Sequence, residues 1–458
     1  MIISTLDNVE VNIENGHKYA LCDIEKGENI IKYGMPIGHA TEKIKRGEHI
    51  HTHNLRTNLS GKIEYTYNRK EYAKEAFEPL SEINAYIRES GEIGIRNEIW
   101  IVNTVGCVNK TAQILSEKTG ARYFSHPYGC SQLGGDLKTT QLILRGLVRH
   151  PNAAGVLVVG LGCENNNIDE FCKILGCYDK NRVRFLNCQN AADEVAEGIR
   201  LIGELEKYAA GFRRERVSAA HLKIGLKCGG SDGLSGITAN PLVGRVSDWI
   251  IACGGSCVLT EVPEMFGAEQ LLMERCINES VFEKTVRLIN GFKEYYQRHN
   301  QVIYENPSPG NKEGGITTLE EKSLGCVQKG GVSPVVDVLS YGDTIQKSGL
   351  SLLDGPGNDM CAVTNLTAAG VHMILFTTGR GTPLGAPVPT LKISSNKGLY
   401  ERKKNWIDFD ASAVLENGFG NAARSLADKI VAVAGGEKTL NEKNGYSEIA
   451  IFKDGVTL

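Results

Sequence analysis

Several features that would point directly to a function are absent from this chain of 458 residues. The longest strongly apolar run, residues 153–161, is far shorter than the roughly twenty residues that cross a bilayer, so we expect no membrane partner. Lysine and arginine total 51 against 54 aspartates and glutamates, and no basic stripe stands out, which argues against nucleic acid as a partner. Residues 1–7 have neither a basic start nor an apolar core, so we predict no signal peptide.

Two classes of motif are also missing. None of the glycine-rich loops matches the G-x-G-x-x-G or Walker pattern, so nucleotide binding is not expected. None of the thirteen cysteines falls in a C-x-x-C pair, although metal-site cysteines often come in such pairs. Thirteen cysteines without a secretion signal indicate reduced thiols in a cytoplasmic protein rather than a disulfide framework.

What is present divides the chain into four parts. Residues 1–75 predict a small β module, because the similar segments 24–30 and 44–50 each place a glycine turn between short runs of β-branched residues. The polar residues 76–96 are interpreted as a linker. Residues 97–300 alternate apolar strands with amphipathic helices, which predicts an α/β domain with a mostly parallel sheet. Residues 301–458 resume this alternation after a Pro/Gly-rich start and predict a C-terminal α/β domain.

The loops that follow the predicted strands carry reactive side chains. Ligands of open α/β sheets bind beyond the carboxyl ends of the strands. Four of five such ends present a cysteine, and the fifth presents two carboxylates: Cys107, Cys130, Cys163 beside Glu164, Cys228, and the pair Glu261 and Glu264. A single cysteine there is ordinary packing material, but several at equivalent positions can gather around iron or zinc. We keep Cys163, Glu164, Cys228 and Glu261 as one candidate metal set.

A second candidate is a row of histidines. His49, His51 and His53 alternate along the chain, so an extended strand would project all three imidazoles from one face. His51 and His53 are the preferred metal ligands, because Fe²⁺ and Mn²⁺ both accept imidazole, and His49 is expected to stay solvated. His39, His51 and His53 are also candidate acid–base groups, since imidazole titrates near neutral pH.

Glycine-rich loops predict where an anionic ligand would bind. After one predicted strand, Gly229 and Gly230 would expose backbone N–H groups to a carboxylate or phosphate, with Lys227 as a charged catalytic candidate. Arg380, between two glycines, suits a bidentate grip on a carboxylate. The expected substrate-binding residues are Asn54, Gly229, Gly230, Ser231, Asp232, Arg380 and Thr382. The structural alternative for this loop is a tight turn in which Asp232 or Ser235 caps the next helix.

Over nearly its whole length the chain resembles the altronate/galactarate dehydratase family. The resemblance is carried by long strings such as Tyr-Gly-Met-Pro-Ile-Gly-His-Ala and Leu-Thr-Glu-Val-Pro-Glu-Met-Phe-Gly, and the matching stretches are residues 33–40, 51–54, 160–166, 228–240, 259–267, 306–315 and 377–383. It implies that the N-terminal module is a SAF-type β-clip domain, followed by larger family-specific α/β domains.

The resemblance also implies an activity: dehydration of D-altronate to 2-dehydro-3-deoxy-D-gluconate, assisted by Fe²⁺ or Mn²⁺, in the bacterial degradation of galacturonate. Such a reaction removes a weakly acidic proton from C2 beside a carboxylate and expels hydroxide from C3, so positive charge must stabilise the intermediate. The expected partners are a small sugar-acid substrate and further copies of the chain. Galactarate dehydration, sulfite elimination from sulfolactate, an iron–sulfur redox enzyme and a non-catalytic sugar-acid binding protein remain the alternatives.

Overall fold

The N-terminal domain is a β module built from two small sheets. In the computed structural model, which describes residues 1–73 and 82–458, one sheet has the order β1 (Val9–Val11), β2 (Lys18–Ala20), β5 (His49–Ile50). The other has the order β3 (Asn29–Lys32), β4 (Met35–Ala40), β6 (Leu55–Arg56). Both predicted glycine turns are present, because Gly27 and Gly47 adopt φ values of 86° and 82°. The two similar segments pair with each other through a bridge between Ile24 and Ile44.

The second domain alternates strands and helices as predicted. Its four-stranded parallel sheet has the order β10 (Arg122–Phe124), β9 (Glu98–Asn103), β11 (Ala153–Gly160), β12 (Val183–Asn187). Two helix pairs, each in mutual contact, pack on this sheet: α1 (Asn109–Thr119) with α4 (Glu194–Ala209), and α2 (Gly134–Arg149) with α3 (Ile168–Leu175). Because strand β11 is buried along its whole length, its sequence is a continuous apolar run instead of an alternating one.

The expected linker is wrong from residue 82 onward. Strands β7 (Glu82–Ile87) and β8 (Ile93–Gly94) join β13 (Arg214–Ser218) in a three-stranded antiparallel sheet. Strand β7 buries Ile83 and Ala85 and exposes Asn84 between them. The partner strand β13 lies more than a hundred residues later, so local sequence gave no sign of the pairing. The remainder of the predicted linker, residues 76–81, lies outside the described residues.

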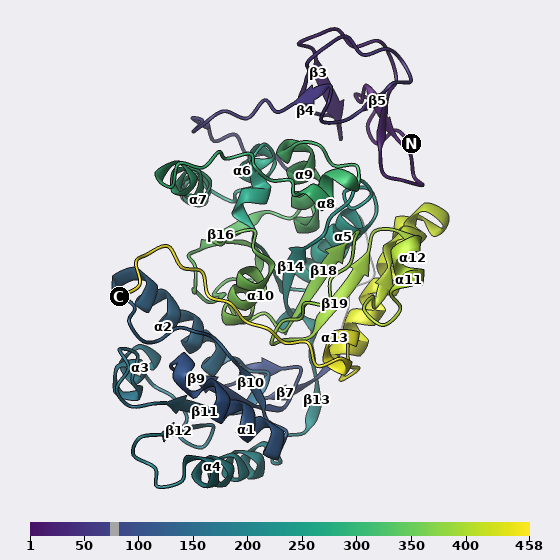
Figure 1. Cartoon of the computed structure of the whole chain (residues 1–458). Helices are drawn as coiled ribbons and strands as arrows, with labels where there is room; N and C mark the ends of the chain where they lie inside the picture. The colour runs from purple at the N-terminus through teal and green to yellow at the C-terminus, as the bar shows by residue number, and fades with distance from the viewer. Residues whose placement is uncertain (74–81) are drawn as a thin grey trace.

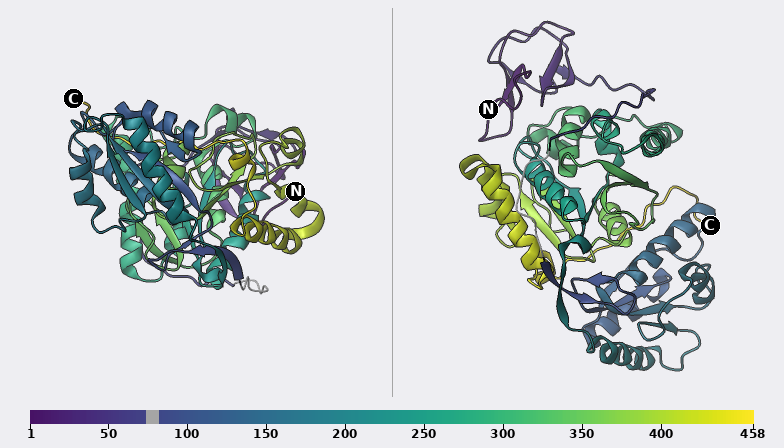
Figure 2. Two further views of the ribbon diagram at one scale, coloured as in Figure 1. Left: turned by 90° about the horizontal axis from the view of Figure 1, so that it is seen from below. Right: turned by 180° about the vertical axis from the view of Figure 1, so that it is seen from behind.

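The third domain is built on a seven-stranded parallel sheet (Figures 1 and 2). Its strand order is β16 (Val335–Leu339), β17 (Gly349–Leu353), β15 (Ser256–Leu259), β14 (Lys223–Cys228), β18 (Met373–Thr378), β19 (Thr390–Ser394), β20 (Phe409–Asp410). Strands β14 and β15 come before residue 300 and the others after it, so the expected domain boundary at residue 300 runs through one sheet. The fold class, a small β domain followed by α/β domains with parallel sheets, is confirmed.

Helices surround this sheet and carry the N-terminal domain. They are α5 (Ala239–Ala252), α6 (Glu269–Met273), α7 (Glu279–Arg298), α8 (Pro309–Glu313), α9 (Leu319–Cys326), α10 (Asp359–Ala368), α11 (Lys397–Arg402), α12 (Val414–Ala434) and α13 (Leu440–Lys443). Five short 3₁₀ helices complete the described secondary structure: Gly106–Val108, Ala219–His221, Val262–Met265, Val327–Gly330 and Ala411–Ala413. Among the described residues, no helix combines the length and the apolar character needed to span a bilayer.

The N-terminal domain sits over helices α8 and α9 (Figure 1). Its lysines Lys18 and Lys32 both pair with the buried carboxylate of Glu321, at 2.8 and 2.7 Å. Thr57 Oγ1 donates to the neighbouring Glu320 carboxylate at 2.7 Å. Separating a buried carboxylate from its lysine partners costs about 3–5 kcal/mol. These ion pairs therefore hold the N-terminal domain in one orientation. Helix α9 therefore links the N-terminal domain to the carboxyl edge of the large sheet, where its last residue, Cys326, lies.

Candidate active site

The carboxyl edge of the seven-stranded sheet has a topological switch point between β14 and β18. From β14 the chain order runs outward to β15 on one side, and β18 begins the run β19, β20 on the other. The loops after these two strands pair with each other, because the N–H groups of Gly379 and Arg380 donate to the carbonyl of Gly230 at 3.0 and 2.8 Å. Switch points of this kind are the usual ligand sites of open α/β sheets. Two of the predicted glycine-rich loops therefore meet where a ligand is expected.

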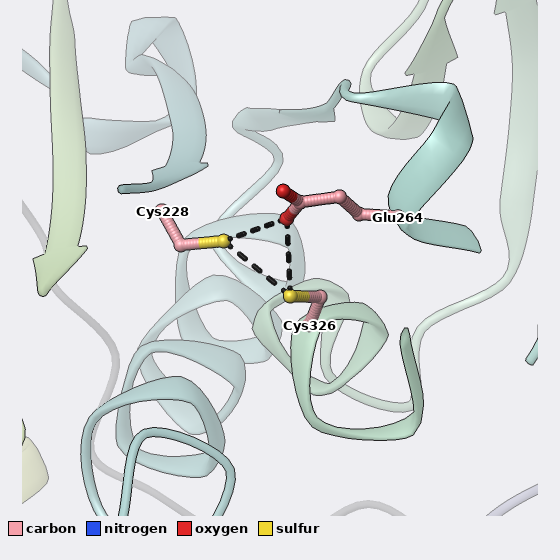
Figure 3. A group of neighbouring side chains, drawn as sticks. All are labelled: Cys228, Glu264 and Cys326. Atoms are coloured by element: carbon pink, nitrogen blue, oxygen red, sulfur yellow. Dashed lines mark hydrogen bonds between the residues drawn. The ribbon is translucent and has the colours of Figure 1, made fainter. Parts of the chain in front are cut away.

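Two thiols and a carboxylate converge beneath this edge (Figure 3). Sγ of Cys228, at the end of β14, lies 3.1 Å from Oε2 of Glu264 and 3.4 Å from Sγ of Cys326. Sγ of Cys326 lies 3.2 Å from the same Glu264 oxygen. All three side chains are buried. We call Cys228, Glu264 and Cys326 the thiol–carboxylate cluster; among the described residues it is the one group of three or more such side chains whose ligand atoms all lie close enough to share an ion.

Buried lysines surround the thiol–carboxylate cluster. Lys322 pairs with Glu264 at 2.8 Å, and Lys227 pairs with Glu261 and, at 2.7 Å, with Asp359. Burial raises the pKa of Glu264, but the positive charges, led by Lys322, outweigh it and hold this pKa well below its usual range. Glu264 is therefore a carboxylate at neutral pH.

The pKa values of the two thiols of the cluster are shifted in opposite directions. A hydrogen bond from Cys326 lowers the pKa of Cys228 to about 6, against the effect of burial. The same hydrogen bond, together with burial, raises the pKa of Cys326 well above its usual value. One thiolate and one thiol therefore share the site at neutral pH, and the thiolate is the form that binds metals or acts as a nucleophile.

A cavity of about 750 Å³ opens beside the cluster. Cys228 and Glu264 form part of its wall, and Asp359, at the start of α10, lines it as well. Most of the remaining lining groups can form hydrogen bonds: Gly229, Gly230, Asn306, Ser308, Asn311, Lys312, Lys322 and Asn358. Sites for small ligands commonly measure about 300–1,000 Å³. The many hydrogen-bonding groups of this lining favour a ligand rich in hydroxyl and carboxylate groups.

Some of the predicted substrate-binding residues line this cavity and others do not. Gly229 and Gly230 do. Asp232 instead accepts hydrogen bonds from Ser235 of its own loop and from Ser395 and Asn396, so it ties two segments together. It does not form the expected helix cap, because Thr238 is the N-cap residue of the next helix, α5. The Ser231 hydroxyl is buried and, among the described residues, has no hydrogen-bond partner.

Three further predicted residues have structural contacts. The Asn54 amide donates to the His49 carbonyl and accepts from the His51 N–H, so it closes a turn within its own domain. Thr382 Oγ1 accepts from the N–H of Leu384 at 3.3 Å. Arg380 lies against Gly230, but its side chain is half-exposed and its guanidinium pairs with Glu313 at 2.7 Å. None of these three lines the cavity, although Arg380 lies beside Gly230 and Thr382 beside Leu384, which do.

The histidines gather in a way that the sequence only partly predicted. Strand β5 ends at Ile50 and residues 51–54 form a turn, so the expected three-histidine strand is wrong. The rings still meet, because His49 lies 5.5 Å from His51 and 5.9 Å from His53, measured between ring centroids. His17, from the neighbouring strand region, joins them with Nδ1 3.0 Å from Nε2 of His49. We call His17, His49, His51 and His53 the histidine cluster.

Within this cluster, His49 is the central residue and not the solvated one that we expected. Burial and the neighbouring histidines, His17 first, lower its pKa to about 4. His53 is exposed, and both ring nitrogens of His51 have partners, Nε2 with the Lys312 carbonyl at 2.9 Å and Nδ1 with Thr52 Oγ1 at 3.2 Å. The predicted ligand pair of His51 and His53 is therefore not preformed. His39 lies apart and contacts Asn58 at 2.8 Å.

The alternative metal set is also divided. Cys163 and Glu164 belong to the second domain, where Glu164 accepts hydrogen bonds from Thr104 Oγ1 and from backbone N–H groups of its own loop. Cys228 and Glu261 lie at the large sheet instead, and their side chains are 3.6 Å apart. The candidate functional side chains that the sequence reasoning missed are His17, Cys326, Lys322 and Asp359. Glu264 was visible beside Glu261, but no local spacing connects it to Cys326, which lies 62 residues later.

Comparisons with known proteins match every part of this architecture. The family model described as "D-galactarate/Altronate dehydratase, C-terminal" matches residues 219–457, slightly more than half of the chain. The chain belongs to this family. The models "D-galactarate dehydratase/Altronate hydrolase, second domain" and "Altronate/galactarate dehydratase SAF domain" match residues 85–210 and 5–58. The predicted family and its N-terminal SAF domain are thereby confirmed.

Curated relatives extend over nearly the whole chain. An altronate dehydratase of Escherichia coli K12 is 52% identical, covering 98% of this chain and 93% of the relative. An altronate dehydratase of Bacillus subtilis 168 is 51% identical with the same coverage. A galactarate dehydratase (L-threo-forming) of Escherichia coli K12 is 30% identical over 96% of this chain and 90% of the relative. The chain is therefore much more similar to these altronate dehydratases than to the galactarate dehydratase.

Proposed function

We propose that this protein is a hydro-lyase that dehydrates D-altronate to 2-dehydro-3-deoxy-D-gluconate and water. The observation that carries the proposal is the 51–52% identity to altronate dehydratases over 98% of the chain, against 30% to the galactarate enzyme. We further propose that it acts in the cytoplasm, in the degradation of galacturonate. The thirteen free cysteines support a reducing compartment, and assembly into homo-oligomers stays a prediction.

The cavity at the switch point supports a hexonate as substrate. Three amide side chains, Asn306, Asn311 and Asn358, line it and suit the hydroxyl groups of a sugar acid. Lys312 and Lys322 line it too and add positive charge for the carboxylate. An uncharged, apolar ligand would leave these groups without partners, which costs about 1–3 kcal/mol for each buried group.

Residues of the cavity can serve the removal of the C2 proton and the stabilisation of the negative charge that follows. Asp359 faces the cavity and is held by Lys227, so we assign it the removal of the C2 proton. Lys227 itself is fully buried behind Asp359 and Glu261, which makes it a positioning residue and not the catalytic group that we expected. The Lys322 ammonium lies where it can stabilise the negative charge that develops on the substrate carboxylate. His51 reaches the same wall indirectly, through the Lys312 carbonyl.

We propose the thiol–carboxylate cluster as the place for the Fe²⁺ or Mn²⁺ that the family resemblance implies. Its donor set fits Fe²⁺ better, because thiolates are a poor match for Mn²⁺. The nearby lysines oppose a cation, whereas the thiolate of Cys228 and the carboxylate of Glu264 favour it. A divalent ion bound there would neutralise charge on the substrate as C2 loses its proton. The histidine cluster is the competing place, through His17 and His49.

The test is a product assay with the full chain purified without oxygen. Its metal content is measured, and formation of a 2-keto-3-deoxy acid is followed with D-altronate, galactarate and sulfolactate. We expect turnover of altronate well above the other two. A metal-loaded preparation that produces a keto acid from another substrate and none from altronate would show that the assignment is wrong.

Thermal unfolding and visible absorption of the same preparation separate the rival classes of function. A binding protein would be stabilised by hexonates against heating but form no product. An iron–sulfur enzyme would be brown and lose its visible absorption on reduction. The structure gives an iron–sulfur centre little support, because Cys107, Cys130 and Cys163 are exposed, and among the described residues they form no group with ligand atoms close enough to share an ion.

A further inference from the structure

A second cavity of about 170 Å³ lies away from the switch-point cavity and has an aromatic lining. Phe292 and Tyr295 come from helix α7, Tyr341 follows strand β16, and Phe452 belongs to the C-terminal segment. Ring centroids are 5.4 Å apart for Phe292 and Tyr295, 5.5 Å for Tyr295 and Phe452, and 5.9 Å for Tyr341 and Phe452. The Phe452 N–H donates to Tyr341 Oη at 2.9 Å, which fixes the C-terminal segment at this wall.

One carboxylate, Asp354, lines this cavity. Its backbone is held in place, with the N–H donating to Leu339 and the carbonyl accepting from Asn365. Burial raises the pKa of Asp354 to about 6, partly opposed by the Gly355 N–H, so the cavity imposes a cost on the ionised form. Among the described residues, Asp354 has no ion pair within 4 Å, although Arg287 also lines the cavity, where its guanidinium is exposed and pairs with Glu283 at 3.7 Å.

A carboxylate among aromatic rings is a recognised arrangement for binding an organic cation. Ring faces carry negative charge and attract an ammonium group within about 6 Å, most strongly where water is excluded. Arg298 already covers Tyr295, at 5.7 Å from the ring centroid, whereas no cation is found over Phe292, Tyr341 or Phe452 in the described part of the chain. A volume of about 170 Å³ resembles the roughly 150 Å³ that holds a benzene molecule in another protein.

We propose that this cavity binds a small organic monocation, an alkylammonium or compact quaternary ammonium, with its charge beside Asp354 and its carbon atoms against Phe292, Tyr341 and Phe452. The site goes beyond the proposed dehydration. It adjoins that reaction structurally, because Asp354 and Gly355 begin the loop whose residues 357–359 line the switch-point cavity. A ligand here would therefore contact the start of the segment that carries Asp359.

The test measures binding of tetramethylammonium and of butylammonium to the full chain by calorimetry, with NaCl and KCl at equal ionic strength as salt controls. We expect saturable binding of at least one ammonium ion and no saturable binding of sodium or potassium. Asp354→Asn, which keeps the shape and removes the charge, should weaken binding roughly tenfold or more. Asp428→Asn, at an exposed carboxylate of helix α12, is the matched control and should leave binding unchanged.

A second variant keeps the test valid if Asp354→Asn does not fold. Gly291 lines the cavity, and an added Cβ there meets no atom within 4 Å, so Gly291→Leu should occupy the cavity without altering charge. It should abolish ammonium binding. Equal binding in all variants, equal binding of potassium, or no saturable binding to the unmodified protein would overturn the proposal. None of these outcomes depends on altronate turnover, so the two proposals fail independently.

Discussion

The histidine cluster and the thiol–carboxylate cluster both bring ligand-forming side chains together, but in opposite environments. The histidine cluster lies on the small domain, partly exposed, and three of its four members come from five consecutive residues. The thiol–carboxylate cluster is fully buried and draws Cys228, Glu264 and Cys326 from three distant segments. In the thiol–carboxylate cluster, the hydrogen bond between Cys326 and Cys228 separates the pKa values of the two thiols, and nearby lysines lower that of Glu264. In the histidine cluster, partial burial and repulsion from the other histidines lower the pKa of His49. The histidine cluster, whose pattern is visible in the sequence, is therefore the less well-formed site of the two.

The two clusters are nevertheless close to one cavity. His51 contacts the carbonyl of Lys312, and Lys312 lines the cavity beside which the thiol–carboxylate cluster lies. Helix α8, which carries Lys312, thus separates the two groups of side chains. Variants that remove one cluster at a time show which cluster binds metal and which contributes to turnover.

The largest effect is expected for Glu264→Gln. It removes a carboxylate from the thiol–carboxylate cluster and leaves Lys322 without its partner, which costs about 3–5 kcal/mol for a buried pair. We expect loss of bound metal and a fall in turnover of roughly 100-fold or more. Metal analysis and the keto-acid assay measure both.

Glu442→Gln provides the matched control for that variant. Glu442 also forms a buried ion pair, with Arg96 at 2.6 Å, but it lies outside the cavity lining. It should lower the melting temperature while metal content per folded protein is maintained. If Glu264→Gln kept both metal and turnover, the thiol–carboxylate cluster would not be the metal site.

A smaller effect is expected for His51→Ala. The variant removes the contact to the Lys312 carbonyl, so we expect turnover to fall roughly tenfold, with metal retained. Roughly tenfold is the lower end of the effect of removing a group that supports a metal site without binding the metal. Metal analysis of this variant beside Cys228→Ser compares the two clusters directly. Metal lost in His51→Ala and His53→Ala but kept in Cys228→Ser would place the ion at the histidines, as the sequence first suggested.

Arg380→Lys tests whether the loop after β18 holds the substrate carboxylate. A buried bidentate guanidinium would be worth about 2–3 kcal/mol, but this one is half-exposed and already paired with Glu313. We therefore expect KM for altronate to rise several-fold, roughly 1 kcal/mol, with little change in kcat. Unchanged kinetics with a lowered melting temperature would mean that Arg380 only ties two loops together.

The smallest effect is expected for the pH dependence of stability. The pKa of His49 is about 4 in the folded chain against an ordinary value of 6.5, so the unfolded chain binds more protons between these values. The corresponding stability is present above pH 6.5 and is lost as pH falls toward 4. Urea unfolding of metal-free protein at about pH 7.5, 5.5 and 4.5 should show a smaller loss in His49→Gln than in the unmodified chain. Parallel losses would assign the acid sensitivity elsewhere, for example to the buried His150, whose pKa is lowered to about 3.

The sequence alone determined the family, the β module with its two glycine turns, and the alternation of strands and helices, because each depends on local patterns of apolar residues and turns. It also placed the loops of Gly229–Gly230 and Arg380 at the carboxyl edge of the sheet. It failed at residues 82–96 and at residue 300, since strands β7 and β13, or β14 and β18, pair across more than a hundred residues.

Only the tertiary structure decided which reactive groups share a site. Cys228 and Cys326 are 98 residues apart, and the packing of α9 against the end of β14 brings their sulfur atoms within 3.4 Å. Other long-range contacts give Asp232 and Lys227 supporting roles, and the pairing of β2 with β5 brings His17 to the other histidines. Direct contact and burial set the pKa of a thiol or carboxylate, and both depend on neighbours that are distant in the chain. Local sequence lists the candidates, and long-range packing selects among them.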